Sequence, residues 1–247
     1  MNPRTAAILS ILVVTIAVTS CGGEGQDEPK ARSRPAEASG APGVLTGRIL
    51  FEGDAPPPRR LAVNKDEGAC AHAAREVQDV LVSGGGGLSE AIVEIHSVPG
   101  SSGESTGDRR VEIRQKDCMF QPRVLAVLAG TKVAIHNDDP VSHNVNSGDW
   151  NHMQYQGSPP MEETFEFGGR SFVRVNCNIH SWMEAWVYVA RTEAYAMTGS
   201  DGSFRIEGVP PGTYEATVSH PALGVERFEV SIESGATVDR TVKFKAR

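Results

Sequence analysis

The sequence lacks the paired cysteine motifs that mark several common redox and metal centres. It has four cysteines in 247 residues and no C-x-x-C or C-x-x-C-H element, which excludes a thioredoxin-like site and covalently attached c-type haem. Its closely spaced Cys–His pairs do not show the paired spacings of a four-ligand structural zinc site. Basic clusters are also absent and the formal net charge is −7, which argues against nucleic acid as a partner.

Little in the chain predicts helix, apart from a turn or two over residues 69–77. From residue 43 onward, short β-type runs are separated by Gly, Pro and Asp. This pattern predicts an all-β sandwich fold. The strands expected before residue 191 cover residues 44–51, 77–82, 91–96, 111–114, 124–129, 132–137, 163–167, 172–175 and 184–190.

The longest apolar run, residues 6–18, follows Arg4 at the N-terminus. It is shorter than the roughly 20 apolar residues of a membrane span and is typical of an export signal. The small residues Thr19 and Ser20 precede Cys21, which resembles a bacterial lipoprotein signal with Cys21 as the lipidated first residue. An ordinary secretory peptide cut elsewhere is the alternative. Both interpretations predict export. The lipoprotein signal also predicts a lipid anchor on the periplasmic or cell-surface side of a bacterial membrane.

Residues 22–42 are rich in Gly, Pro, Ala, Glu and Ser and contain no aromatic residue. Such a segment buries too little apolar surface to fold, so we expect a flexible tether. The rest of the chain is long enough for one or two small domains. We expect a first domain over residues 43–191, with an N-terminal strand extension, and a second over residues 192–247.

The most informative motif is Cys177-Asn-Ile-His180-Ser-Trp-Met183, spaced C-x2-H-x2-M. A thiolate, an imidazole and a thioether within seven residues indicate a soft metal. Two His, one Cys and a weak axial Met form the coordination set of blue copper. His143 is the candidate for the second imidazole. Each residue also has a structural explanation, as a buried thiol, a surface histidine or a core methionine.

Two other histidines compete with His143 for the second position. His136 falls within an alternating strand, where a histidine is often simply hydrogen-bonded. His152 lies near Trp150 in the stretch of residues 147–161, without a known ligand spacing. Both therefore stay open as alternatives.

The cysteine count supports a metal at Cys177. If Cys21 carries lipid, three cysteines remain, and an odd thiol is unusual in an oxidising compartment. A Cys70–Cys118 disulfide with Cys177 on the metal resolves this imbalance. A disulfide from Cys177 to one of the other two would destroy the site, and the sequence leaves that pairing open.

Residues 111–190 resemble a plastocyanin- or amicyanin-type cupredoxin. Residues 137–145, Asn-Asp-Asp-Pro-Val-Ser-His-Asn-Val, are similar to the first ligand region, and residues 175–183 are similar to the ligand loop in its shortest, amicyanin-like spacing. The insert of residues 147–161 departs from the family pattern at the rim of the site.

This resemblance implies a Greek-key β-sandwich with one type 1 copper per chain. It implies His143, Cys177 and His180 as equatorial ligands and Met183 as the axial one. Asn144 would hold the ligand loops by hydrogen bonds. The ring edge of His180 would face solvent as the electron's exit route, with Trp182 as a hydrophobic cover beside the metal.

The second domain resembles the carboxypeptidase regulatory-like, transthyretin-related β-sandwich. Its Asp-Gly and Pro-Pro-Gly turns carry the resemblance, with Gly202 and Gly212 expected at positive φ. Such modules are usually structural and occasionally bind carbohydrate. The whole chain resembles bacterial proteins in which a cupredoxin precedes this module, which implies that residues 43–96 add strands to the cupredoxin.

These features predict an exported, membrane-tethered blue copper protein that carries one electron and is not an enzyme, because the motif shows no open coordination position. A redox donor and acceptor are implied without their identity. Two alternatives remain. One is a non-enzymatic binding or adhesion protein with a carbohydrate or protein ligand, and the other is a copper storage or delivery protein.

Overall fold

The computed structural model describes residues 40–101, 111–166 and 172–245, and these residues form 18 strands and no helix. The predicted all-β class is therefore confirmed. None of the described residues belongs to a helix long and apolar enough to cross a membrane. The expected signal of residues 1–21 and nearly all of the expected tether lie outside the described residues.

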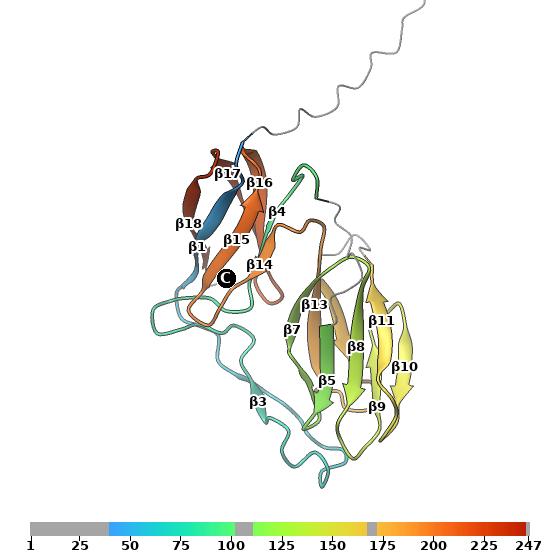
Figure 1. The fold of residues 1–247 in the computed structure, drawn as a ribbon. Helices are drawn as coiled ribbons and strands as arrows, with labels where there is room; N and C mark the ends of the chain where they lie inside the picture. Colours follow the sequence, from blue (N-terminus) through green and yellow to red (C-terminus); the bar gives the residue numbers. More distant parts are fainter. Residues whose placement is uncertain (1–39, 102–110, 167–171, 246–247) are drawn as a thin grey trace, which may run out of the picture. The chain divides into compact units, whose positions relative to one another are not determined.

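The first sandwich has a five-stranded sheet, ordered β10-β9-β12-β13-β7, and a four-stranded sheet, ordered β11-β8-β5-β6 (Figure 1). Its strands are β5 (Val111–Lys116), β6 (Met119–Gln121), β7 (Val124–Leu128), β8 (Thr131–Asn137), β9 (His143–Asn146), β10 (Asn151–Gln154), β11 (Met161–Phe165), β12 (Phe172–Asn176) and β13 (Glu184–Ala190). The 147–161 insert contains β10, which pairs with β9 and extends the five-stranded sheet. Neither β9 nor β10 is expected from the sequence pattern.

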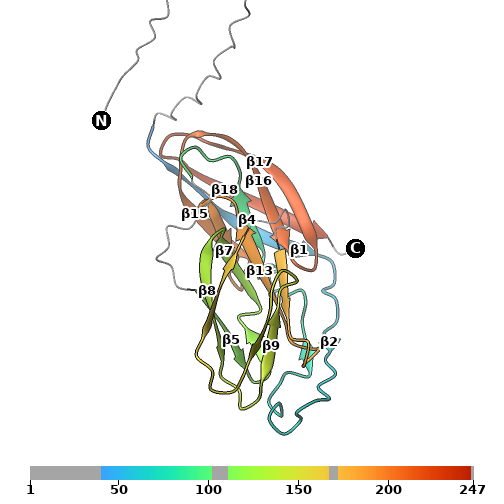
Figure 2. The ribbon, with the colours of Figure 1, turned by 90° about the vertical axis from the view of Figure 1, so that its right-hand side faces the viewer.

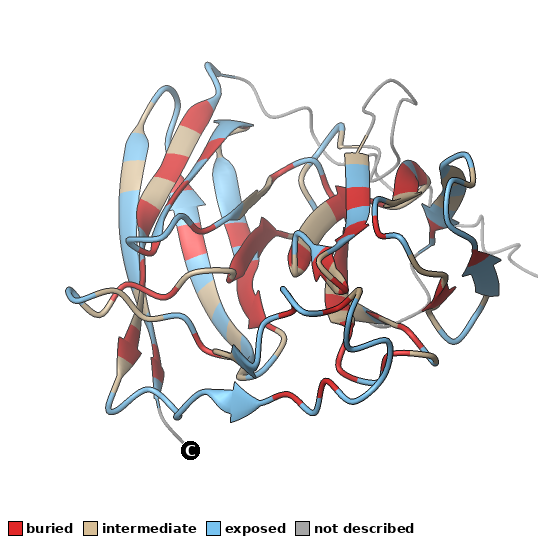
Figure 3. Cartoon of the chain, turned by 90° about the horizontal axis from the view of Figure 1, so that it is seen from below, coloured by how far each residue is buried: buried red, intermediate tan, exposed pale blue. Residues whose placement is uncertain are grey.

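The core of this sandwich forms because side chains alternate between its two faces. Ile113 of β5 and Val133 of β8 pack in one cluster with Val175 of β12 and Val187 of β13, and all four are fully buried. Figure 3 shows buried and exposed bands along strands of the structure. The two sheets therefore hold their strand ends, where the candidate ligands lie, on a packed and rigid frame.

The second sandwich has a three-stranded sheet, ordered β15-β1-β18, and a four-stranded sheet, ordered β14-β4-β16-β17. Its strands are β1 (Gly43–Glu52), β4 (Ile92–Ile95), β14 (Tyr195–Met197), β15 (Ser203–Val209), β16 (Gly212–His220), β17 (Gly224–Ile232) and β18 (Thr237–Lys245). Both β1 and β4 therefore belong to the C-terminal sandwich, and the expectation that they extend the cupredoxin is wrong.

The pairing of β1 completes the three-stranded sheet of the second sandwich with a strand from the N-terminal part of the described chain. The strand lies between β15 and β18 and pairs with β18 in parallel from Val44 to Glu52 (Figure 2). At Gly47 the approach is so close that an added Cβ would lie 1.8 Å from the carbonyl oxygen of Arg240. Only glycine fits there. Without β1, two strands would lose their shared neighbour and expose unpaired edges.

Between β1 and β4, residues 61–77 pack on the first sandwich, whereas Val80 and Leu88 are buried in the core of the second. Leu61 and Val63 are buried in the same cluster as the strands of the first sandwich. The only regular pairing in this segment joins β2 (Arg59–Arg60) to β3 (Glu76–Val77), so the strand expected over 77–82 is reduced to its first residue. The segment is an irregular cover anchored by a few apolar side chains.

The expected role of glycine in the second sandwich holds at one turn and fails at the other. Gly202 has a φ of +80°, a conformation that glycine adopts without cost. Gly212, in contrast, is outside the positive-φ set. An added Cβ at Gly212 would lie 2.8 Å from the hydroxyl oxygen of Tyr214, which donates to the carbonyl of Pro210. Close packing of this tyrosine is the reason for glycine at position 212.

His220, at the end of β16, makes the stability of the second sandwich sensitive to acid. Its ring is 1% exposed, and its Nδ1 accepts the backbone N–H of Ala222 at 3.2 Å. Burial, and then the charge of Arg123, lower the pKa of His220 to about 4. The unfolded chain, with a histidine pKa of about 6.5, therefore binds the proton first as the pH falls. We expect the free energy of unfolding to fall by about 3 kcal/mol between these two pKa values.

Urea unfolding near neutral pH and again near pH 4.5 measures this loss for the wild type and for His220→Gln. The glutamine keeps a side-chain acceptor for Ala222 and does not titrate, so the variant should lose less stability on acidification. The same loss in both proteins would contradict the assignment.

Candidate metal centre

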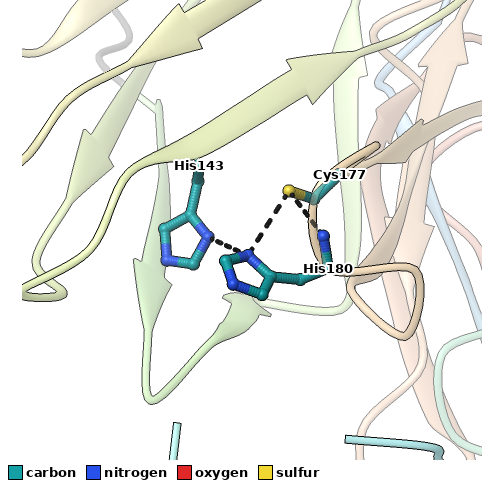
Figure 4. A group of neighbouring side chains, drawn as sticks. All are labelled: His143, Cys177 and His180. Atoms are coloured by element: carbon teal, nitrogen blue, oxygen red, sulfur yellow. Dashed lines mark hydrogen bonds between the residues drawn. The ribbon is translucent and has the colours of Figure 1, made fainter. Parts of the chain in front are cut away.

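Three side chains from different strand ends converge in the first sandwich. His143 is the first residue of β9, Cys177 directly follows β12, and His180 lies in the loop before β13 (Figure 4). The two Nδ1 atoms are 2.9 Å apart, and the Cys177 sulfur is 3.7 Å from Nδ1 of His180. A first-row metal lies about 2.0–2.3 Å from nitrogen and sulfur ligands, so donors at these separations can share one ion.

All three donors are buried, with exposed fractions of 0–2%. The sulfur accepts the backbone N–H groups of Asn144 at 3.3 Å and of His180 at 3.4 Å. Burial disfavours the thiolate, but His143 and these backbone donors outweigh it and lower the pKa of Cys177. The site therefore makes it easier for Cys177 to form the thiolate, which is the form that binds a metal.

The outer nitrogens of both imidazoles contact carboxylates. Nε2 of His143 lies 2.8 Å from Asp139, and Nε2 of His180 lies 2.9 Å from Asp66. A carboxylate only accepts, so each Nε2 carries a proton and the two Nδ1 atoms are the ring nitrogens left to hold a metal. In the metal-free chain a proton between these Nδ1 atoms accounts for their 2.9 Å contact, and a metal ion could take its place. Carboxylate–histidine pairs of this kind orient metal ligands in proteins.

The pKa values of the two imidazoles are shifted in opposite directions. For His143, burial opposes the charged form, but the bonds to Asp139 and Cys177 prevail and raise its pKa. For His180, burial outweighs the opposing bond to Asp66 and lowers its pKa. In the metal-free chain His143 therefore binds a proton more readily than His180 does. The set of one thiolate and two imidazoles fits copper.

Met183 belongs to the same loop and is fully buried. Its backbone N–H donates to the carbonyl of His180 at 2.9 Å, and its own carbonyl accepts the N–H of Cys177 at 3.2 Å. These bonds close the loop that carries the three motif residues. The role of the Met183 sulfur as axial ligand stays a prediction.

Asn144 lies where the resemblance implies, between the two ligand segments. Its side-chain oxygen accepts the backbone N–H of Asn178 at 2.8 Å, and its amide group donates to Asn151. Its backbone N–H is also one of the donors to the Cys177 sulfur. It therefore fixes the Cys177 loop against the strand that carries His143.

The two competing histidines lie outside this group. His152 is 2.8 Å from the carboxylate of Glu163, and its side chain is 48% exposed. His136 lies 3.6 Å from Glu112. Among the described residues, the metal-compatible groups that include a free cysteine contain neither of them.

The disulfide joins Cys70 to Cys118, and Cys177 is free and buried. This pairing agrees with the one expected from the cysteine count. A second group, Cys118 with Asp139 and His143, also has metal-compatible spacing, but the disulfide removes Cys118 as a ligand. Among the residues that the structure describes, one donor set therefore remains.

The expected exposure of His180 is wrong, because its side chain is 0% exposed. Trp182 packs against it with ring centroids 5.0 Å apart, as the expected hydrophobic cover, and Asp66 covers Nε2. Sequence reasoning missed both carboxylates. Asp139 had a signal, four residues before His143 in the ligand region, whereas Asp66 lies 114 residues from His180 and had none.

Comparison with known proteins supports the second domain by sequence. Residues 183–245 match the profile of the carboxypeptidase regulatory-like domain. No curated protein matches the chain at a significant level. The strand topology and this match describe two joined β-sandwiches, the second of which is similar to the carboxypeptidase regulatory-like domain.

Solved structures with similarity to the chain include copper proteins. A Cu(I) amicyanin variant is 19% identical over 39% of this chain and 97% of its own, with a TM-score of 0.29. A second reduced amicyanin variant is 21% identical over 39% and 97%, with a TM-score of 0.26. The copper-containing nitrite reductase from Thermus scotoductus SA-01 is 19% identical over 33% of this chain and 22% of its own, with a TM-score of 0.27. The chain thus spans about a fifth of the reductase.

Proposed function

We propose that this protein is a type 1 copper protein that carries single electrons, with one copper per chain. The observation that carries the proposal is the convergence of one thiolate and two imidazole Nδ1 atoms at a buried point. His143, Cys177 and His180 would hold the ion, and Met183 would add a weaker thioether ligand. When bound, copper would supply a one-electron couple between Cu(II) and Cu(I).

The protein's own contribution is to hold these donors in nearly one geometry for both oxidation states. His143 is fixed by β9 and by Asp139, and Cys177 is fixed by two backbone N–H groups. Asn144 joins the two segments. Such preorganised donors reduce the rearrangement that accompanies a change of charge.

A carrier role fits the site better than catalysis. The donor residues are at most 2% exposed, so a substrate has no path to an open coordination position, which copper catalysis requires. We therefore propose a non-enzymatic function. The nitrite reductase resembles this chain in fold, and its activity is its own.

We further propose that the protein is exported and tethered to a bacterial membrane through lipid on Cys21. The disulfide between Cys70 and Cys118 supports an oxidising compartment. A redox protein would donate and accept the electron. The C-terminal sandwich would keep a structural role or contact a carbohydrate or protein partner.

Voltammetry of the copper-loaded full-length protein tests the carrier function. We expect a reversible one-electron wave at one copper per chain and slow loss of copper to a chelator. Rapid copper exchange without a reversible wave would instead indicate storage or delivery. Failure to bind copper in a folded protein would indicate a binding or adhesion module.

A further inference from the structure

The outer edge of His180 is closed by a segment from far upstream in the chain. Asp66 bonds to its Nε2 at 2.9 Å, and the side chain of Asp66 is 40% exposed whereas that of His180 is not exposed at all. The carboxylate therefore lies between the buried imidazole and solvent. We call residues 64–70, which carry this contact, the cap.

The cap is held in place by its backbone. Asp66 has a φ of +50°, a left-handed conformation that costs a residue other than glycine free energy and often marks a functional position. Its carbonyl accepts the N–H of Cys70 at 2.8 Å, which closes a turn. Leu61 and Val63 anchor the preceding residues in the core of the first sandwich.

The disulfide connects this cap to the second imidazole. Cys70 is bonded to Cys118, and the N–H of Cys118 donates at 2.9 Å to the same Asp139 oxygen that contacts His143. The carbonyl of Cys118 accepts the indole N–H of Trp182 at 3.0 Å. The disulfide thus connects the segment that contacts His180 with the residue that donates to Asp139, the partner of His143.

We propose that Asp66 is a positioning residue of the copper centre and that the cap seals the His180 edge from solvent. This inference depends on the proposed function only in its statements about the copper ion. Asp66 fixes the proton on Nε2 and so leaves Nδ1 free for the ion. Its negative charge also stabilises the more positive Cu(II) state over Cu(I). A redox partner docking at this edge would meet the Asp66 carboxylate rather than the imidazole.

Two substitutions separate the roles of the carboxylate. Asp66→Gly removes the side chain where glycine relieves the left-handed backbone, so the cap loses its contact without added strain. Asp66→Asn keeps an acceptor oxygen and tolerates the same backbone, but removes the charge. Glu67→Gln, at the exposed neighbouring position, is the matched control.

The first measurement uses the metal-free full-length protein and diethylpyrocarbonate, with His180 modification followed by mass spectrometry. A hydrogen bond to a charged group corresponds to a factor of about 10–100 in an equilibrium. We therefore expect modification of His180 to be about 10–100-fold faster in Asp66→Gly than in the wild type. Asp66→Asn should fall between them, and Glu67→Gln should match the wild type. Equal rates of His180 modification in the wild type and in Asp66→Gly would contradict the proposal that the cap seals His180 from solvent.

The second measurement tests the role of Asp66 in positioning His180 separately from the role of the cap in shielding it from solvent. Nitrogen-15 NMR of the histidine side chains should show the Nε2–H form of His180 in the wild type and a mixture of tautomers in Asp66→Gly. In the copper-loaded protein, Asp66→Asn should raise the reduction potential. An unchanged tautomer and an unchanged potential would overturn the positioning role. Because modification and tautomer are read without metal, a wild type that binds no copper would refute the proposed function and leave the cap supported.

Discussion

Replacing Cys70 and Cys118 together by serine is expected to lower the free energy of unfolding by about 4 kcal/mol. The two residues are 48 apart in sequence, and a crosslink across that distance removes much of the unfolded chain's conformational freedom. The measurement is urea unfolding of the full-length protein. His180 should also become reactive toward diethylpyrocarbonate, because the cap loses its attachment.

The double substitution is used because a single one leaves an odd thiol that can pair with Cys177. Ala69→Ser changes a neighbour of Cys70 without touching the crosslink, so its effect should stay within about 0.5 kcal/mol. A loss below about 1 kcal/mol in the double variant would contradict a native disulfide at this position.

Replacing Cys177 by serine is expected to reduce the affinity for Cu(I) by more than about 100-fold, the upper range for outer residues of a metal site. The thiolate is the soft donor of the set, and a hydroxyl does not replace it. Serine still offers an acceptor to the N–H groups of Asn144 and His180, so the fold should be kept. Competition against a Cu(I) chelator measures the affinity.

The control for this variant is His152→Gln, which removes a histidine that pairs with Glu163 outside the site. It should leave the affinity for Cu(I) unchanged. If His152→Gln weakens binding as much as Cys177→Ser does, the donor set is assigned to the wrong residues.

The ligand loop was predictable because its information is local. Cys177, His180 and Met183 lie within one short loop, so their spacing alone indicates a common metal. His143 required the family resemblance, since 34 residues separate it from Cys177 and two other histidines were available. The structure brings His143 and the loop together through the pairing of β9 with β12.

The assignment of strands to the two sandwiches was not predictable in the same way. An alternating strand such as β1 can pair equally well with several sheets, and its sequence says only which face is apolar. Its true partners, β15 and β18, lie at the far end of the chain. The resemblance pointed to the wrong sandwich because it followed the order of the segments.

The exposure of His180 was misjudged for a related reason. The resemblance covers residues 111–190, whereas the covering carboxylate, Asp66, comes from outside that span. The disulfide gave an indirect signal, because it fixes Cys70, four residues after Asp66, against Cys118. Only the three-dimensional structure shows that this crosslink places a charged residue on the ligand's outer edge.

The most direct test of the metal assignment is the visible absorption spectrum of the oxidised, copper-loaded wild type. At one copper per chain, we predict an intense thiolate-to-copper band that disappears in Cys177→Ser. A protein that binds one copper without this band, or that keeps the band in Cys177→Ser, would contradict a type 1 centre at His143, Cys177 and His180.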